Sequence, residues 1–424
     1  MKSVSFSGGL KLPAPKNTPL PQIESVPLPN ILILPLKQHY GTDCIPQVEK
    51  GDHVHRGEVI AQNAQTVINA PAPGHIQAIG QACQSPDGSP CTGITLIPEA
   101  EDSPGLESQA GLKPMQAMFR AGLNDLTPQA MPLLQKIATA QKKGIQTLIV
   151  NGLDEAFVHG GQSALMASTA QDIMAGIDIL QQLFRAEKIL IAVYAKAEEA
   201  VHALLDQVSS DRVQVVPCLA KHPQHKDQML IAALLHQEYP AESSPEEMGV
   251  SVVSAESAYQ VAQCVRHGRS FVHKLITVQV PGNQTPRVLS VPLGTPIRDI
   301  CTYLGWSEDS LGKVILGGPL TGRALFSLDV PITKEMHLLC LQNRDEMYCA
   351  QDAVCFKCGY CVQVCPMRLM PFLISGFSEG GNPELAAKND IQSCIECGCC
   401  AYVCPAGIPL VQWIQFGKSA LNAA

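Results

Sequence analysis

The chain has 424 residues, of which 46% are hydrophobic and 16% charged, and its formal net charge is −8. This length predicts two to four domains, and the composition is ordinary for a soluble protein. No apolar run is long enough to span a bilayer, and the N-terminus lacks the apolar stretch of a secretory signal. The acidic charge and the lack of Lys/Arg clusters argue against nucleic acid as a partner. We therefore predict a cytoplasmic protein.

The N-terminal quarter of the chain predicts an arm followed by a β-domain. Residues 1–30 are rich in proline, and we expect an extended arm that lies on a later domain. Residues 31–98 alternate apolar side chains with turn glycines, which predicts a barrel-sandwich hybrid similar to biotinyl and lipoyl domains. Those domains carry a modified lysine at a hairpin tip, where this chain has Asn63-Ala64-Gln65-Thr66. We therefore expect no swinging-arm role.

Three histidines of this predicted β-domain invite a metal-site interpretation. They are His53, His55 and His75. Histidine is a frequent metal ligand, but no carboxylate or cysteine stands at a sequence spacing that supports a site. We interpret them as exposed turn histidines.

The central part of the chain predicts α/β structure. Residues 99–113 are rich in Glu, Ser, Pro and Gly and are interpreted as a linker. Between residues 114 and 287, strands alternate with helices, which predicts a Rossmann-like domain with a mainly parallel sheet. The predicted strands are 147–150, 188–194, 212–217, 249–253 and 274–280.

Residues 288–335 predict a small β-grasp-like (SLBB) unit. Its Gly317-Gly318-Pro319 segment is glycine-rich, as phosphate-binding turns are, but no helix begins directly after it. We interpret the segment as a structural turn.

The most specific motif is a cysteine pattern that occurs twice between residues 345 and 424. It reads Cys355-Phe-Lys-Cys358-Gly-Tyr-Cys361-Val-Gln-Val-Cys365-Pro, and again Cys394-Ile-Glu-Cys397-Gly-Cys-Cys400-Ala-Tyr-Val-Cys404-Pro. Each run is C-x2-C-x2-C-x3-C-P, the pattern with which bacterial ferredoxins hold two 4Fe–4S clusters. Three thiolates at this spacing fit around one cube, and the fourth cysteine reaches the other cube.

This spacing predicts two ligand sets in a ferredoxin-like domain. The first set is Cys355, Cys358, Cys361 and Cys404, and the second is Cys394, Cys397, Cys400 and Cys365. Zinc is the alternative, because C-x2-C also occurs in zinc knuckles. Zinc does not account for a third cysteine at the same spacing or for the Cys-Pro endings, so the pattern favours iron and sulfur.

The order of segments resembles RnfC, a component of the Rnf-type ion-translocating electron-transport complex, along nearly the whole chain. The matching residues are Phe6–Gly9, Val48–Asp52, Ala70–Gly74, Leu148–Gly152, Lys221–Gln224, Val291–Pro296, Gly317–Pro319, Ser327–Pro331, Cys365–Pro371 and Ile395–Cys400. The resemblance implies the flavoprotein fold of respiratory complex I joined to a ferredoxin domain. It also implies FMN, a reaction with NADH, and electron transfer through both clusters to membrane partners.

One stretch departs from that family. Its flavin loop has the form GxGGAGFPT, whereas this chain has Ala121-Gly122-Leu-Asn-Asp-Leu-Thr-Pro128-Gln-Ala. The glycines that let backbone amides approach a phosphate are missing. The segment that begins at Leu153-Asp154-Glu155 keeps its acids but not the rest of the family's nucleotide-site pattern. We therefore expect neither FMN nor NADH at this site.

The sequence thus predicts an electron-transfer subunit that relays single electrons through two 4Fe–4S clusters, with no catalytic residue of its own. The resemblance implies other subunits of a membrane complex and a soluble or subunit-borne redox carrier as partners. It also implies a peripheral position on the inner membrane through those subunits. The alternative is an FMN-containing subunit that oxidises NADH and admits electrons to the complex.

Overall fold

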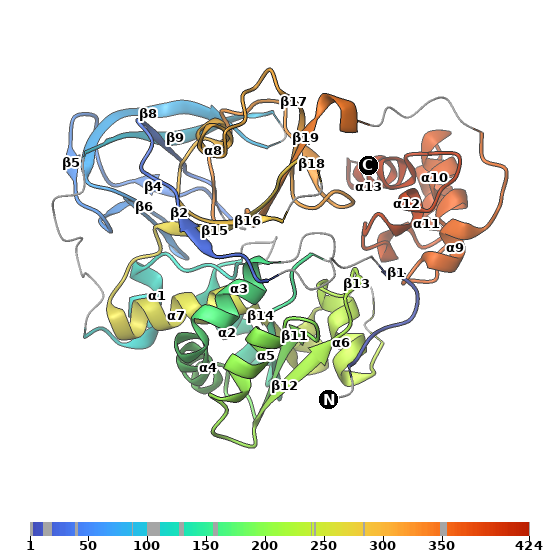
Figure 1. The fold of residues 1–424 in the computed structure, drawn as a ribbon, viewed down its shortest axis with the longest axis horizontal. Helices are drawn as coiled ribbons and strands as arrows, with labels where there is room; N and C mark the ends of the chain where they lie inside the picture. The colour runs from blue at the N-terminus through green and yellow to red at the C-terminus, as the bar shows by residue number, and fades with distance from the viewer. Residues whose placement is uncertain are drawn as a thin grey trace.

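The computed structural model describes residues 3–11, 19–38, 41–86, 88–99, 111–126, 131–155, 160–238, 240, 243–282, 285–347 and 354–423. Figure 1 shows an N-terminal β-unit at the upper left, an α/β unit below it, a second β-unit at the top and a small helical unit on the right. Most of the predicted linker lies outside the described residues.

The N-terminal β-unit consists of two small sheets. Their strand orders are β3-β9-β8-β5 and β4-β6-β7. The strands are β3 (Leu32–Pro35), β4 (Ile45–Pro46), β5 (His53–Val54), β6 (Val59–Gln62), β7 (Val67–Asn69), β8 (Gly74–Gln84) and β9 (Pro90–Pro98). Leu32, Ile60 and Ile94 are fully buried between the sheets. The apolar residues of the alternating pattern thus face inward and form the core of this unit.

A parallel sheet forms the centre of the α/β unit. Its strand order is β12-β11-β10-β14, and all of its neighbouring strands run parallel. The strands are β10 (Thr147–Asn151), β11 (Lys188–Tyr194), β12 (Val213–Cys218) and β14 (Val250–Ser254). Leu148, Ile149 and Val150 are successive and all fully buried, as expected for a strand covered on both faces.

Helices precede and separate these strands (Figure 1). They are α1 (Pro114–Arg120), α2 (Leu133–Lys143), α3 (Gly161–Ser168), α4 (Ala170–Phe184), α5 (Glu198–Leu205), α6 (Asp227–Leu235) and α7 (Ala255–His267). Helices α4 and α7 pack closely, because Gly176 lets the backbone of α4 approach Ala258, and a Cβ atom at Gly176 would lie 1.8 Å from the Ala258 carbonyl oxygen.

The fifth strand predicted for the parallel sheet lies in another sheet, so that assignment was wrong. Residues His273–Gln279 form β15, which pairs antiparallel with β16 (Arg287–Pro292) and parallel with β19 (Leu338–Asn343). Only a short connection separates β15 from β16, and a short connection allows antiparallel pairing but not the crossover that parallel neighbours need. Local sequence showed the strand but not its partner.

The second β-unit therefore begins before residue 288 and continues beyond residue 335. Its sheet has the order β18-β17-β19-β15-β16-β2. The remaining elements of the unit are β17 (Leu311–Leu316), β18 (Arg323–Ala324) and α8 (Ile297–Tyr303).

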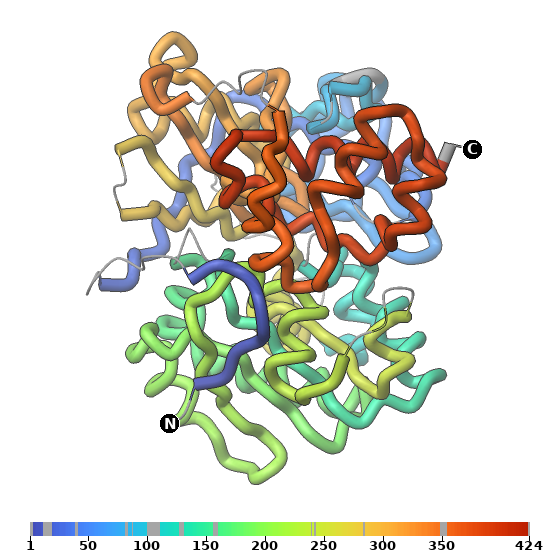
Figure 2. The backbone as a smooth tube through the Cα atoms, turned by 90° about the vertical axis from the view of Figure 1, so that its right-hand side faces the viewer, coloured from blue at the N-terminus to red at the C-terminus, as the bar shows by residue number. Residues whose placement is uncertain are grey.

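The N-terminal arm joins three units. Its strand β1 (Leu10–Lys11) pairs with β13 (Lys221–His222) of the α/β unit, and β2 (Ile23–Ser25) pairs with β16. The Gly9 amide donates to the carbonyl oxygen of Val364 in the helical unit, at 2.8 Å. In Figure 2 this blue segment runs alongside both the green α/β unit and the red helical unit.

The C-terminal unit is helical. Its helices are α9 (Tyr360–Val364), α10 (Pro371–Glu379), α11 (Pro383–Ala387), α12 (Cys399–Tyr402) and α13 (Leu410–Ala423). Ile374, Ile391 and Ile414 are fully or almost fully buried and form its own small core. This core packs α13 over the loops that carry the cysteine runs, as its helical apolar spacing predicts.

Candidate functional site

The two cysteine runs have the same local backbone. In each run the residue before the second cysteine has a positive φ, 56° at Lys357 and 53° at Glu396. The glycine after that cysteine is also left-handed, with φ 84° at Gly359 and 76° at Gly398. A short helix follows in both, α9 in the first run and α12 in the second. A repeated motif in the sequence thus gives a repeated loop-and-helix unit.

The four cysteines of the second predicted set lie around one cavity. Cys365, Cys394, Cys397 and Cys400 line about 380 Å³ of empty space together with apolar side chains such as Leu369 and Ile374. Cys365 comes from the first run, so the fold brings the fourth cysteine of one run to the first three of the other.

The cysteines of the first predicted set lie nearer the surface. Cys355 and Cys358 are exposed and interact electrostatically with Cys361, which is buried. Cys404 packs in the apolar cluster that contains Cys361. This set is therefore open to solvent on the side of Cys355 and Cys358.

Backbone amides surround the cysteine sulfurs. The Glu396 amide donates to the Sγ atom of Cys394 at 3.4 Å, and amides of α9, α10 and the following loops do the same for Cys361 and Cys365. Burial raises the pKa of the Cys394 thiol to about 11. A hydrogen bond from Cys399, outweighing burial, lowers the pKa of Cys397 to about 7. Because iron binds thiolates, assembly of a cluster here displaces protons.

His222 of the α/β unit contacts the second run directly, which the sequence did not reveal. Its Nε2 atom lies 2.6 Å from the carbonyl oxygen of Cys397. Burial lowers the pKa of His222 to about 4, so the ring is neutral and its Nε2–H donates to that carbonyl. The Cys399 thiol donates in turn to the carbonyl oxygen of His222, at 3.9 Å.

A large cavity lies between the α/β unit, the second β-unit and the second cysteine run. It has about 2380 Å³ of empty space. Asn151 and Lys226 line it from the α/β unit, Gly317 from the second β-unit, and Cys394 and Glu396 from the cysteine run. The carboxyl end of β10 opens into it, which is the usual position of a ligand site in a parallel sheet.

The described part of the flavin-loop stretch carries a buried ion pair. Asp125 is fully buried, and the Lys136 Nζ atom of α2 lies 2.5 Å from its Oδ2 atom. The hydroxyl of Ser257 donates to Asp125 and accepts from the amide of Leu126. Burial lowers the pKa of Lys136, but the carboxylates of Asp125 and Asp227 outweigh this effect and raise it. Residues 127–130 lie outside the described residues.

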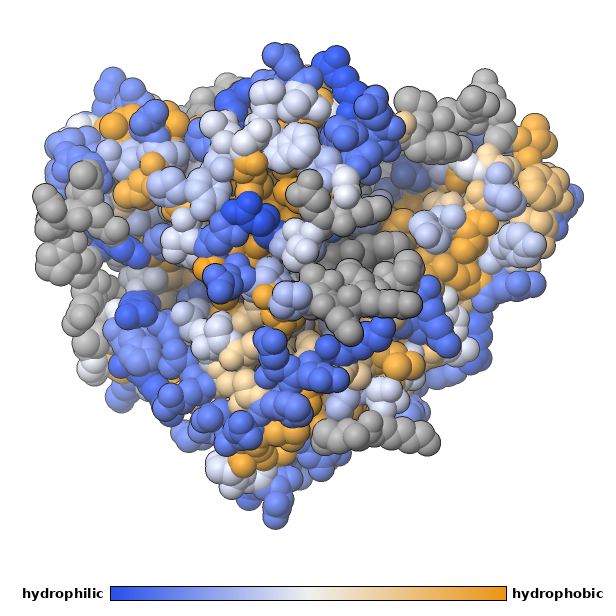
Figure 3. Space-filling model, viewed as in Figure 1, coloured by the Kyte–Doolittle hydropathy of each residue, from blue (hydrophilic) through white to orange (hydrophobic). Residues whose placement is uncertain are grey.

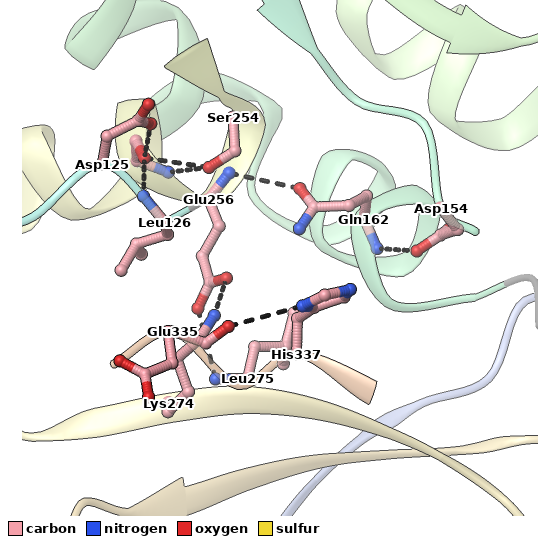
Figure 4. Close-up of polar contacts among 11 residues, drawn as sticks. Asp125, Leu126, Asp154, Gln162, Ser254, Glu256, Lys274, Leu275, Glu335 and His337 are labelled. Carbon is pink, nitrogen blue, oxygen red and sulfur yellow. Dashed lines mark hydrogen bonds and ion pairs between the residues drawn. The ribbon is translucent and has the colours of Figure 1, made fainter. Parts of the chain in front are cut away.

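Figure 4 shows that neighbouring polar groups also bind one another. The buried Lys274 forms an ion pair with Glu256, whose backbone amide donates to the side-chain oxygen of Gln162. The amide of Gln162 donates in turn to Asp154, at 2.7 Å. Both lysines that reach this region from α2 and β15 are thus bound to carboxylates.

Asp154 occupies the N-terminus of α3. Its carboxylate accepts hydrogen bonds from the amides of Gly160, Gln162 and Ser163 and from the Ser163 hydroxyl. A helix N-terminus is a common binding place for a phosphate, because its first amides have no partner within the helix. Here a carboxylate of the same chain already takes those amides.

Glu155 occupies the glycine-rich turn in the same way. Its Oε1 atom accepts from the Thr321 hydroxyl at 2.5 Å, and its carboxylate also accepts from the Gly318 amide. A Cβ atom at Gly318 would lie 2.0 Å from Glu155 Oε1. The turn needs glycine because this carboxylate comes close, which agrees with its interpretation as a structural turn.

Comparisons with protein families match three parts of the chain. The RnfC barrel sandwich hybrid domain matches residues 4–101, the Nuo51 FMN-binding domain matches residues 118–263, and the 4Fe-4S dicluster domain matches residues 354–408. They agree with a multidomain fold of mixed α/β content and with a ferredoxin-like, iron–sulfur C-terminal unit.

Curated relatives match almost the whole chain. The C-type subunit of the ion-translocating oxidoreductase complex of Rhodobacter capsulatus is 30% identical over 438 residues, which are 100% of this chain and 84% of that protein. The protein of the same name from Pseudomonas aeruginosa is 31% identical over 99% of this chain but only 56% of its own length. The chain thus spans little more than half of that relative.

A relative from Clostridium ljungdahlii, the C-type subunit of a proton-translocating ferredoxin:NAD(+) oxidoreductase complex, is 27% identical over 88% of this chain and 84% of its own length. A crystal structure of an NAD+-reducing NiFe hydrogenase in the H2-reduced state has a TM-score of 0.47, with 15% identity over 73% of this chain and 60% of that chain.

None of the described helices is both long and apolar enough to cross a bilayer. The full-length matches and the order of the three domains are those of one group of proteins. The chain belongs to the RnfC family, whose members are subunits of Rnf-type, ion-translocating oxidoreductase complexes.

Proposed function

We propose that this chain relays single electrons through two 4Fe–4S clusters within a membrane-associated, ion-translocating oxidoreductase complex. Cys355, Cys358, Cys361 and Cys404 would hold one cluster, and Cys394, Cys397, Cys400 and Cys365 the other. The observation that carries the proposal is the exchange of the fourth cysteine between the two runs. Two independent zinc sites do not require this exchange, whereas paired cubane clusters do.

The chain's own groups prepare these positions for a buried anionic centre. The thiolates bind iron, and the amides near Cys394 and Cys361 donate toward sulfur. Lys418 of α13 donates to the carbonyl oxygen of Cys394 at 2.6 Å, which adds a positive charge close to the second set. Each cluster, when bound, supplies a one-electron redox couple whose potential depends on such hydrogen bonds and on solvent exposure.

The first set offers an outlet to a partner. Cys355 and Cys358 are exposed, and so are the neighbouring apolar side chains of Val354, Phe356 and Tyr360. Figure 3 shows apolar surface over this unit, on the right of the molecule. An exposed apolar rim around a cluster suits a surface that docks another subunit or a redox carrier.

We propose that the Nuo51-like domain of this chain does not hold FMN. The phosphate of FMN needs unpaired amides or cations, yet Asp154 takes the amides of α3, and Lys136 and Lys274 are bound to Asp125 and Glu256. A further phosphate would face several buried carboxylates. Electrons would then arrive from another subunit or a carrier rather than from NADH bound here.

The other units are proposed to serve as a scaffold. In this proposal the α/β unit is Rossmann-like, the sheet of β15 to β19 is β-grasp-like (SLBB), and neither contributes a catalytic residue. Docking on partner subunits at the inner membrane would place the chain at the cytoplasmic surface.

A second candidate function is that of an NADH-oxidising subunit with FMN, through which electrons enter the complex. The cavity that opens at the end of β10 and reaches Cys394 favours it, because such a cavity would place a bound flavin next to the second set. The match of residues 118–263 to a FMN-binding domain also favours it.

The first test determines iron, acid-labile sulfide and flavin in protein purified anaerobically. We expect about eight irons per chain, no flavin, and no reduction of the clusters by NADH. Stoichiometric FMN with rapid reduction by NADH would instead establish the NADH-oxidising function. About one or two zinc ions per chain in place of iron would refute the cluster proposal.

The ligand sets are tested by substitution. Cys365→Ala and Cys404→Ala should each lower the iron content from about eight to about four per chain. Cys399→Ala is the matched control, since this thiol lies beside Cys400 but is not in either set, and it should retain all the iron. Loss of iron in the control and not in the two variants would contradict the assignment.

A further inference from the structure

The N-terminal β-unit brings together three side chains that are far apart in the sequence. His53 lies on β5, His75 on β8, and Glu99 directly follows β9. One ligand atom from each residue lies within 4.8 Å of the other two. The sequence indicated no metal site because no carboxylate stands near these histidines along the chain, and the fold supplies that carboxylate from residue 99.

The backbone holds these three residues in place. His53 and His75 are direct partners in the β5–β8 ladder. The bonds from Gly51 N to Ile76 O and from Ile76 N to Asp52 O, both 2.8 Å, lie beside this pair. The amide of Glu99 donates to the carbonyl oxygen of Pro73 at 2.9 Å.

The two imidazoles converge on opposite oxygens of one carboxylate. His53 Nε2 lies 3.3 Å from Glu99 Oε2, and His75 Nε2 lies 3.2 Å from Glu99 Oε1. The His53 and His75 rings are 4.9 Å apart, centre to centre. Tetrahedral zinc with ligand bonds of about 2.0–2.1 Å separates its ligand atoms by about 3.3–3.4 Å, which is close to these spacings.

We propose that His53, His75 and Glu99 form a binding site for a divalent first-row transition metal ion of the zinc type, separate from the cysteine runs. Two imidazole nitrogens and one carboxylate oxygen are a donor set that zinc takes in proteins, with water in the remaining position. Magnesium and calcium prefer oxygen ligands and do not suit two imidazoles. The three side chains are 39–57% exposed, so the remaining position is open to solvent.

A bound ion would join β5, β8 and the end of β9 at one edge of the sandwich. It would therefore stabilise the N-terminal unit by mass action, to an extent set by the ratio of free metal to the dissociation constant. This role does not depend on the function of the clusters and goes beyond the proposed electron relay.

The test is anaerobic equilibrium dialysis of the cluster-loaded protein against micromolar zinc, with zinc and iron both measured by mass spectrometry. We expect one zinc per chain to bind without loss of iron. His53→Ala, His75→Ala and Glu99→Gln should each weaken zinc binding at least tenfold. Millimolar magnesium or calcium should not compete.

His55→Ala is the matched control. Its ring lies 5.3 Å from that of His53 but does not belong to the site, so the variant should bind zinc as the parent protein does. Since all four side chains are on the surface, the variants should keep the iron content and the circular dichroism of the parent. Equal zinc uptake by the parent and the His53→Ala variant, or no uptake beyond zinc that displaces iron, would overturn the proposal and leave only ion pairs at this place.

Discussion

The Nε2–H group of His222 donates to the carbonyl oxygen of Cys397, and this bond connects the α/β unit to the second cysteine run. Both residues are buried. The bond joins residues 175 positions apart, so it helps to fix the position of the helical unit on the rest of the molecule.

His222→Ala should loosen the second cysteine set. The substitution removes a buried donor and leaves the Cys397 carbonyl without it, at a cost of about 1–3 kcal/mol. We expect four of the irons to be released to a chelator faster than in the parent protein, while the other four are released at the parent rate. His202→Ala, on the outer part of α5, is the control and should change neither rate. Equal acceleration for all irons would show a general loss of stability instead.

Lys274→Met should destabilise the protein strongly. The variant leaves Glu256 as a buried, unpaired carboxylate, and breaking a buried pair typically costs about 3–5 kcal/mol. A double variant, Glu256→Gln with Lys274→Met, should recover part of this loss. Thermal unfolding followed by circular dichroism measures the effect. The exposed pair of Lys143 and Glu247 provides the control, and Lys143→Met should leave the Tm unchanged.

The stability of the protein should depend on Lys334 at alkaline pH. This lysine is buried, donates to the carbonyl oxygens of Val67 and Gly122, and burial lowers its pKa from 10.5 to about 8. Between these two values the unfolded chain holds a proton that the folded chain has released, so this contribution to stability rises with pH. Below pH 8 both states are protonated and the contribution is constant.

The comparison with Lys334→Met isolates this effect. From pH 8 to pH 10.5, the stability of the parent protein should rise relative to the variant, by an amount on the order of 3 kcal/mol. Denaturant unfolding at several pH values measures the difference. The exposed variant Lys143→Met should show no such trend against the parent, and a flat difference for Lys334→Met would contradict the lowered pKa.

Two glycines in helices should respond in opposite ways to alanine. A Cβ atom at Gly176 of α4 would lie 1.8 Å from the carbonyl oxygen of Ala258, so Gly176→Ala must separate α4 from α7. A Cβ atom at Gly376 of α10 would meet nothing within 4 Å. Gly376→Ala should therefore stabilise its helix by about 0.5–1 kcal/mol, whereas Gly176→Ala should lower the Tm markedly. A similar small effect of both changes on thermal unfolding would contradict the close packing of α4 on α7.

Several features followed from the sequence alone because they depend on local spacing. The repeated cysteine pattern predicted one loop-and-helix unit twice, and both runs have it, with matching positive φ angles at Lys357 and Glu396. The apolar spacing after Cys404 predicted the helix α13. The strands β10, β11, β12 and β14 also lie within a residue of their predicted positions, because each is a short apolar run between turn or helix signals.

The tertiary structure alone decided which distant residues meet. The strand His273–Gln279 could be recognised locally, but its place in the second sheet depended on β16 and β19. Glu99 reaches His53 and His75 only through the β8–β9 pairing, and Lys136 reaches Asp125 only after α2 has folded back. Sequence periodicity reports which face of an element is apolar, whereas a charge pair or a metal site requires side chains from separate elements to converge. That convergence is determined by the packing of the whole chain.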